Sequence, residues 1–173
     1  MQIRNHIYKK GTSLVETVIY TTLLSVLSVV AVTSLLLLNQ SLQRMVLGRI
    51  VDDAAQEIME KIIREIRFAD NVDTINSTLS VNPSILILDS TTVGGTPTEI
   101  EFSISASTLE FKRDGVLVGP LTPNQVTIDE LVFDHITTSV SEAVKVSLVL
   151  QAQRGTVNIE ETFNTTVVLR GSY

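Results

Sequence analysis

One charged side chain, that of Glu16, lies near the start of an apolar stretch that continues to Leu38 without another charge. A charged carboxylate at the centre of a membrane helix costs about 2.5–3.5 kcal/mol, and less near the helix end. Where water is scarce, an unpaired carboxylate also costs several kcal/mol, so it seeks a cation. Glu16 is therefore the candidate functional residue of this stretch, and its chemistry is ion pairing.

Basic residues flank the apolar stretch unequally. Three lie upstream of it: Arg4, Lys9 and Lys10. On the downstream side the first charged residue is Arg44. Because a cluster of basic residues beside a membrane span stays on the cytoplasmic side, we expect a cytoplasmic N-terminus and an extracytoplasmic remainder.

The uncharged stretch Thr17–Leu38 has the length of a membrane span and contains neither Gly nor Pro. At ~1.5 Å per residue it would form a helix about 33 Å long, against a hydrocarbon core of roughly 30 Å. Its polar residues are Ser, Thr and Tyr20, which a helix in lipid tolerates. A secretory signal peptide is disfavoured, because the nearest small residues, at 31–33, are followed by more leucines. A plain, uncleaved signal anchor stays open.

The run Lys9-Lys10-Gly11-Thr12-Ser13-Leu14-Val15-Glu16, followed by a long apolar helix, resembles the class III signal of type IV pilins and type II secretion pseudopilins. The resemblance implies that a prepilin peptidase cleaves between Gly11 and Thr12 and methylates the new N-terminus at Thr12. It also implies that Glu16 becomes the fifth-position glutamate, which in a filament pairs with the N-terminal amine of a neighbouring subunit. Cleavage would remove the basic leader and create that amine.

The composition argues against several classes of function. The chain has 13 basic and 19 acidic residues, a formal net charge of −6, and no cysteine. An acidic exterior offers no footprint for phosphate, so we predict no direct nucleic-acid binding. Without cysteine there is no disulfide, thiol nucleophile or lipid-anchor cysteine.

Few residues could support catalysis or metal binding. The chain has two histidines, and His6 lies in the leader, which leaves His135 for the mature chain. Asp129, Glu130 and Asp134 could offer oxygen ligands to calcium, but their spacing is not that of an EF-hand, and a solvated acidic face is favoured. We predict no enzyme, no catalytic residue, no metal and no cofactor.

Beyond the membrane span the helix is expected to continue as an amphipathic helix. Apolar residues recur at positions about four apart, which predicts one buried stripe: Ile50, Val51, Ala54, Ala55, Ile58, Met59, Ile62, Ile63 and Ile66. Charged residues, Glu65 among them, fill the other faces. Glu57 and Glu60 are spaced for i, i+4 ion pairs with Lys61 and Arg64. A single helix from about Ser13 to Ala69 is predicted.

After residue 70 the apolar period changes to the alternation of strands. Strands are predicted at 84–88, 99–104, 109–113, 116–118, 125–133, 144–151 and 156–169. Asp114-Gly115 predicts a type I′ hairpin turn. Glu161 is the one charge on the apolar face of the last strand, which favours a rim or edge position. The predicted fold class is α+β, with a long N-terminal helix packed on an antiparallel sheet, as in pilins.

Segments of the head also resemble one subclass of the family: residues 62–69, 109–115, 129–133 and 165–171 are similar to minor pilins of the PilW type and J-class pseudopilins. Three regions are predicted: a leader at 1–11, a membrane or filament-core helix at 12–47, and a head at 48–173, with its amphipathic helix at 48–70 and its sheet at 71–173.

The resemblance implies a filament subunit that primes assembly or sits at the tip. Its partners would be prepilin peptidase, other pilin-like subunits and the assembly platform. It would reside in the inner membrane and then in an extracellular filament or a periplasmic pseudopilus. The alternatives are a membrane-anchored adhesin or binding module that is never processed, and an anchored enzyme.

Overall fold

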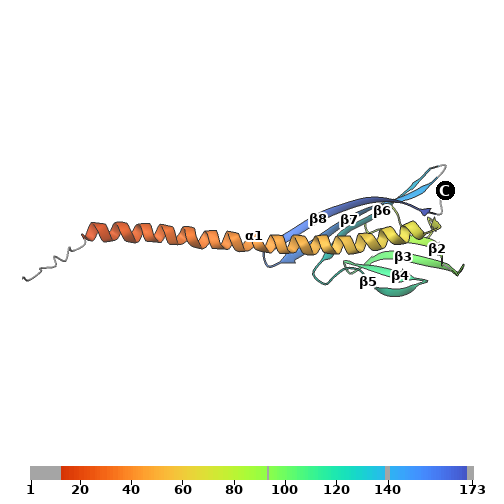
Figure 1. Cartoon of the computed structure of the whole chain (residues 1–173), viewed down its shortest axis with the longest axis horizontal. Helices are drawn as coiled ribbons and strands as arrows, with labels where there is room; N and C mark the ends of the chain where they lie inside the picture. Colours follow the sequence, from red (N-terminus) through yellow and green to blue (C-terminus); the bar gives the residue numbers. More distant parts are fainter. Residues whose placement is uncertain (1–12, 93, 139–140, 171–173) are drawn as a thin grey trace, which may run out of the picture. The chain divides into compact units, whose positions relative to one another are not determined.

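The computed structural model describes residues 13–92, 94–138 and 141–170. The described chain has one helix, α1 (Leu14–Phe68), followed by eight strands (Figure 1). Its contacts divide it into two compact units, Met1–Leu42 and Gln43–Tyr173. The predicted helix is confirmed to within a residue at each end.

In the first unit, α1 begins at Leu14 with the backbone N–H of Thr17 donating to the carbonyl of Ser13, 3.1 Å away. Glu16 lies in the first turn of the helix. A carboxylate at this end is favoured by the partial positive charge of the helix N-terminus. The helix starts at Leu14, three residues after Gly11, the residue that precedes the predicted cut.

In the second unit, α1 buries one face, as the stripe predicted. The fully buried side chains include Val51, Ile58, Ile62 and Ile66, while Ile50 and Ile63 are partly buried. The helix ends at Phe68, where the N–H of Ala69 still bonds to the carbonyl of Glu65.

The chain after α1 first forms a five-stranded antiparallel sheet in the order β1-β2-β3-β4-β5. The strands are β1 (Asn71–Val72), β2 (Leu86–Thr91), β3 (Pro97–Ser105), β4 (Thr108–Arg113) and β5 (Val116–Pro120). Asp114 and Gly115, between β4 and β5, have φ of 51° and 74°. Positive φ at both central residues defines the type I′ turn, so that prediction is confirmed.

A second, three-stranded antiparallel sheet has the order β6-β7-β8. Its strands are β6 (Thr127–Thr137), β7 (Glu142–Arg154) and β8 (Val157–Val168). The sequence predicted a single sheet, and the structure corrects this to two. Glu161 lies on β8, an edge strand, where it was expected.

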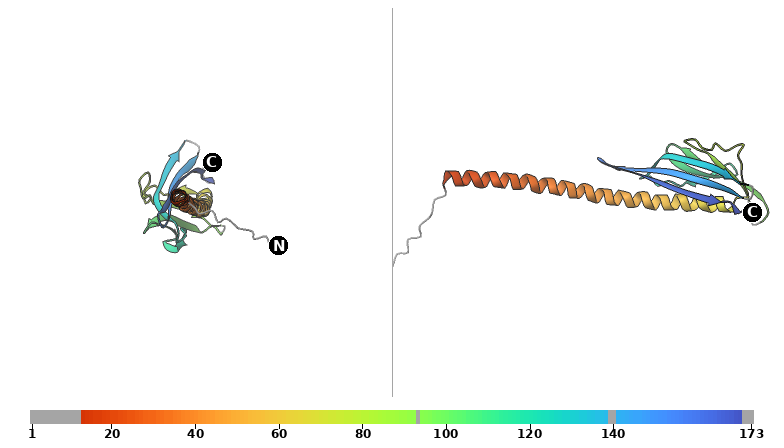
Figure 2. Two further views of the ribbon diagram at one scale, coloured as in Figure 1. Left: turned by 90° about the vertical axis from the view of Figure 1, so that its left-hand side faces the viewer. Right: turned by 90° about the horizontal axis from the view of Figure 1, so that it is seen from above.

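Both sheets pack on the buried face of the head part of α1. In Figure 1 one sheet lies above the helix and the other below it, and the view from above in Figure 2 places both along one side of the helix. One cluster of buried side chains contains residues of α1 and of both sheets, such as Ile58, Phe102 and Phe133. The helix thus joins two sheets that do not pair with each other. The α+β class is confirmed, with a long N-terminal helix packed on antiparallel sheets.

Candidate membrane and assembly segment

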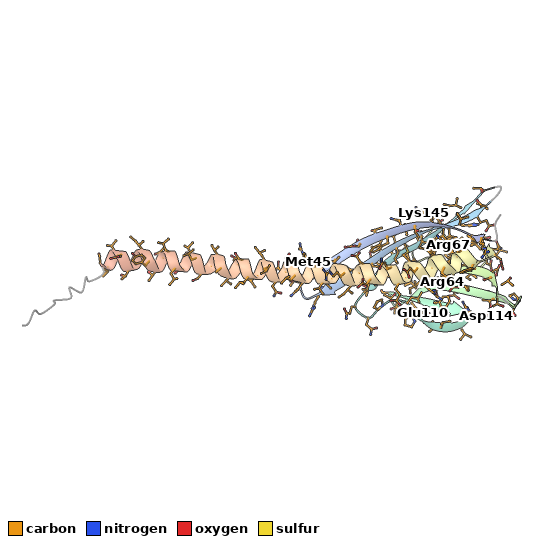
Figure 3. The ribbon with its side chains drawn as sticks, viewed as in Figure 1. Met45, Arg64, Arg67, Glu110, Asp114 and Lys145 are labelled. Carbon is orange, nitrogen blue, oxygen red and sulfur yellow. The ribbon has the colours of Figure 1, made fainter. Side chains whose placement is uncertain are left out.

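The side chains of α1 in the first unit are exposed on every side of the helix (Figure 3). This part of the helix is long and apolar enough to cross a membrane, and none of it is buried. Its large exposed side chains, each more than half accessible, include Val18, Leu24, Leu27, Val30, Leu35 and Leu37. Such a surface requires apolar surroundings. The segment is therefore a candidate for a single membrane span.

Six serine and threonine hydroxyl groups of this segment donate to carbonyls within the helix. Thr21 and Ser25 donate to the carbonyls of Thr17 and Thr21, at 2.9 and 2.8 Å. Ser28 donates to the carbonyl of Leu24 at 2.8 Å, and Thr17, Thr22 and Thr33 make similar bonds. Because no hydroxyl of this set needs water, the helix can enter a dry environment without losing hydrogen bonds.

Glu16 is exposed in the first turn of α1. Within the described ranges, no basic side chain lies at ion-pair distance from its carboxylate. The residues predicted to act with it lie outside those ranges: Arg4, Lys9, Lys10, Gly11 and Thr12. Cleavage after Gly11 and methylation of Thr12 therefore stay predictions.

In the head, a carboxylate of α1 lies among cations from two elements. Glu65 is 8% exposed, and its oxygens lie 2.6 Å from Nζ of Lys61 and 3.4 Å from Nη2 of Arg113 on β4. Nζ of Lys61 also lies 4.1 Å from the centroid of the Phe111 ring, a cation–π contact. This cluster holds α1 against the five-stranded sheet.

The same cluster corrects two sequence predictions. Glu65 was expected on a face outside the buried stripe, but it is buried and pairs with Arg113 of β4. Lys61 was expected to pair with Glu57, but it pairs with Glu65, because the Phe111 ring draws its ammonium to the sheet side of the helix. Helical spacing allows either pair, and only the position of β4 decides between them.

A second ion pair lies on the other face of the five-stranded sheet. Nζ of Lys112 is 2.8 Å from Oε1 of Glu101, which stands opposite it in the register of β3 and β4. Burial would raise the pKa of Glu101, but hydrogen bonds from Lys112 and Ser103 and the charge of Lys112 outweigh it and lower the pKa. The hydrogen bond to Glu101 raises the pKa of Lys112.

The remaining candidates for chemistry lie on the three-stranded sheet. Nε2 of His135 on β6 lies 3.4 Å from Oε2 of Glu142 on β7. The carboxylate of Asp134 lies 3.6 Å from Nζ of Lys145, which Figure 3 labels. Asp129 and Glu130 are exposed on β6. Within the described part of the chain, no three His, Cys, Asp or Glu side chains are grouped to hold a metal ion.

Comparisons of the chain with models of protein families, with curated proteins and with solved structures found no match. The class of the protein therefore rests on its architecture. A long apolar N-terminal helix followed by antiparallel sheets is pilin-like.

Proposed function

We propose that this protein is a structural and assembly subunit of a type IV pilus or a type II secretion-like filament. The observation that carries the proposal is the signal Lys9–Glu16, whose last residues form the first turn of a helix whose apolar side chains have no cover within their own unit. The resemblance of the head segments supports a minor subunit that primes assembly or sits at the tip.

In the proposed mechanism, the leader and the apolar helix first hold the chain in the inner membrane. Prepilin peptidase cuts after Gly11, which removes three side-chain cations and creates an amine at Thr12. The amine of one subunit then pairs with Glu16 of a neighbour as the helices leave the bilayer and bundle. The pair compensates both charges for the hydration that they lose in the bundle. Because the amine exists only after the cut, assembly requires cleavage.

The proposal predicts that Glu16→Ala leaves the protein in the membrane but lowers its incorporation into filaments. The loss should exceed about tenfold, because one unpaired buried charge costs more than 1.4 kcal/mol. The measurement is the amount of the chain in sheared and purified filaments, relative to the amount in membranes. Glu60→Ala, at an exposed position of the head helix, is the matched control.

Equal incorporation of the wild type and Glu16→Ala would contradict this role of the carboxylate. Stable, unprocessed chain in the membrane together with normal filaments would favour the alternative, a membrane-anchored adhesin or binding module.

A further inference from the structure

The three-stranded sheet has two edges, and the chain itself covers one of them. Along the outer edge of β6, the N–H groups of Ser80 and Ser84 donate to the carbonyls of Phe133 and Leu131, at 2.9 and 3.0 Å. The N–H of Phe133 donates in return to Oγ of Ser84, at 3.2 Å. The edge of β6 is thus closed by the loop that precedes β2.

The other edge, along β8, presents alternate backbone groups outward. The hairpin turn at Gly155 and Thr156 closes on the pair Arg154↔Val157, and the register continues without a shift to Ala143↔Val168. In a two-residue hairpin the closing pair is hydrogen-bonded, and bonded pairs then alternate along the strands. The N–H of Leu169 donates to the carbonyl of Glu142, which confirms that the odd-numbered residues belong to the hydrogen-bonded pairs.

Odd-numbered residues of β8 therefore bond to β7, and even-numbered residues direct their N–H and C=O groups to the open edge. The outward-facing set is Asn158, Glu160, Thr162, Asn164, Thr166 and Val168. In the ranges that the structure describes, no backbone hydrogen bond joins this set to another element.

Of the features that usually discourage pairing, the edge of β8 has an inward-facing charge, Glu161, but neither a proline nor a bulge. β5, the edge of the other sheet, is short, ends in Pro120 and faces a register shift between Phe111 and Lys112. Bulges and prolines of this kind block the addition of strands. β8 has 12 residues, a continuous register and no proline.

The side chains of β8 indicate what would bind there. On its inner face, Ile159 and Phe163 are only partly buried, and Glu161 lies between them. The strand contains two glutamates and no basic residue. Pairing of β8 with a second copy of itself would bring only acidic charges together, so a different strand that carries a cation fits this edge better.

We propose that the outer edge of β8 is a strand-addition site for an extended segment of a partner protein. The segment alternates apolar and polar residues and has a basic residue opposite Glu161. Its backbone would pair with the outward groups of β8, and its apolar side chains would cover Ile159 and Phe163. The proposal rests on the proposed filament function only for the identity of the partner, a neighbouring subunit.

The test is amide hydrogen exchange of the full chain in detergent micelles, resolved by residue. The probe is a synthetic peptide of the length of β8 that alternates Val and Thr and has one Lys opposite Glu161. In the chain alone, the even-numbered amides of β8 should exchange at least about tenfold faster than the odd-numbered ones. Saturating peptide should slow the even-numbered amides by at least about tenfold, and a peptide with Glu in place of Lys should do so less.

Proline variants supply the matched pair. Thr162→Pro removes an N–H that faces the open edge, so the variant should fold like the wild type and lose the protection by the peptide. Thr165→Pro removes an N–H that bonds to β7, so this variant should lower the unfolding midpoint. Comparing the two proline variants therefore separates the loss of strand addition at the edge from damage to the sheet itself.

Three results would overturn the proposal. The first is that the even-numbered amides are already protected from exchange in the chain alone, for example by a homodimer. The second is that the Lys peptide does not slow exchange in the wild type. The third is that the peptide protects Thr162→Pro as strongly as it protects the wild type. Processing after Gly11 does not enter this assay, so an uncut chain that still binds the peptide would refute the filament function and leave the strand-addition site standing.

Discussion

Glu65 is a buried carboxylate with three cations at ion-pair distance, Lys61 and Arg64 from α1 and Arg113 from β4, with Arg64 the most distant at 3.9 Å. Lys61 comes from the preceding turn of α1, and Arg113 comes from β4, at 2.6 and 3.4 Å. The carboxylate side chain is 10% exposed, while that of Arg113 is 47% exposed. Removing the carboxylate therefore leaves two cations, Arg64 and Arg113, with access to solvent and one, Lys61, still on the Phe111 ring.

We predict that Glu65→Ala lowers the free energy of unfolding by about 1–2 kcal/mol. This is below the loss of about 3–5 kcal/mol that follows when a fully buried pair is broken, because Arg113 reaches water. Denaturant unfolding of the full chain in detergent, followed by circular dichroism, measures the change. Glu60→Ala is the control and should stay within about 0.5 kcal/mol of the wild type. Equal effects of the two substitutions would show that the cluster does not stabilise the head.

The Glu101–Lys112 pair predicts a pH dependence. Because the pKa of Glu101 in the folded state lies below the ordinary value of 4.5, its ionised form stabilises the fold above that pH. This contribution is lost as the pH falls below 4.5 and through the folded-state pKa. Unfolding measured between neutral and acidic pH should show a steeper loss of stability for the wild type than for Glu101→Gln, by less than about 1 kcal/mol. Identical slopes would contradict the pair's role.

At the scale of elements, the hairpin between β4 and β5 depends on its turn. Gly115 has φ of 74°, in the left-handed region that β-branched residues avoid, and no atom crowds the position of an added Cβ. Any loss of stability on substitution there comes from the backbone conformation and not from a steric clash.

We predict that Gly115→Val destabilises the fold by about 1–2 kcal/mol, the cost of holding such a residue at positive φ. Thr156→Val, in the turn between β7 and β8, is the control, because Gly155 takes the positive φ of that turn, 61°. Thermal or denaturant unfolding compares the two. A loss of the same size at both positions would show that side-chain chemistry, and not φ, sets the effect.

The elements differ in how far the sequence predicted them. The bounds of α1 and the turn at Asp114-Gly115 depend on local period and on preferred φ, so local sequence was sufficient. The division of the strands into two sheets was missed, because it depends on which edges meet across long separations. The bonds from Ser80 and Ser84 to β6, which close one edge of the second sheet, join segments about fifty residues apart.

The candidate site was predicted unevenly for the same reason. Glu16 stands out in the sequence, because a charge beside a long apolar stretch is visible without a fold. The buried position of Glu65 was not visible, because Arg113 and Phe111 reach it from β4. The open edge of β8 likewise appears only when the sheet order is known.

At the scale of the molecule, α1 serves two surroundings with one continuous helix. Its residues in the first unit leave apolar side chains exposed, and six of their hydroxyls bond within the helix, whereas its residues in the second unit bury one stripe against two sheets. In the proposed function, the first part binds lipid and then the helices of other subunits, and the second part supports the head.

The most direct test of the filament account is the intact mass of the membrane form, expressed with and without a prepilin peptidase. The account predicts a peptidase-dependent product that begins at Thr12, with or without one added methyl group. An uncut chain in the presence of an active peptidase would contradict it and leave a plain signal anchor.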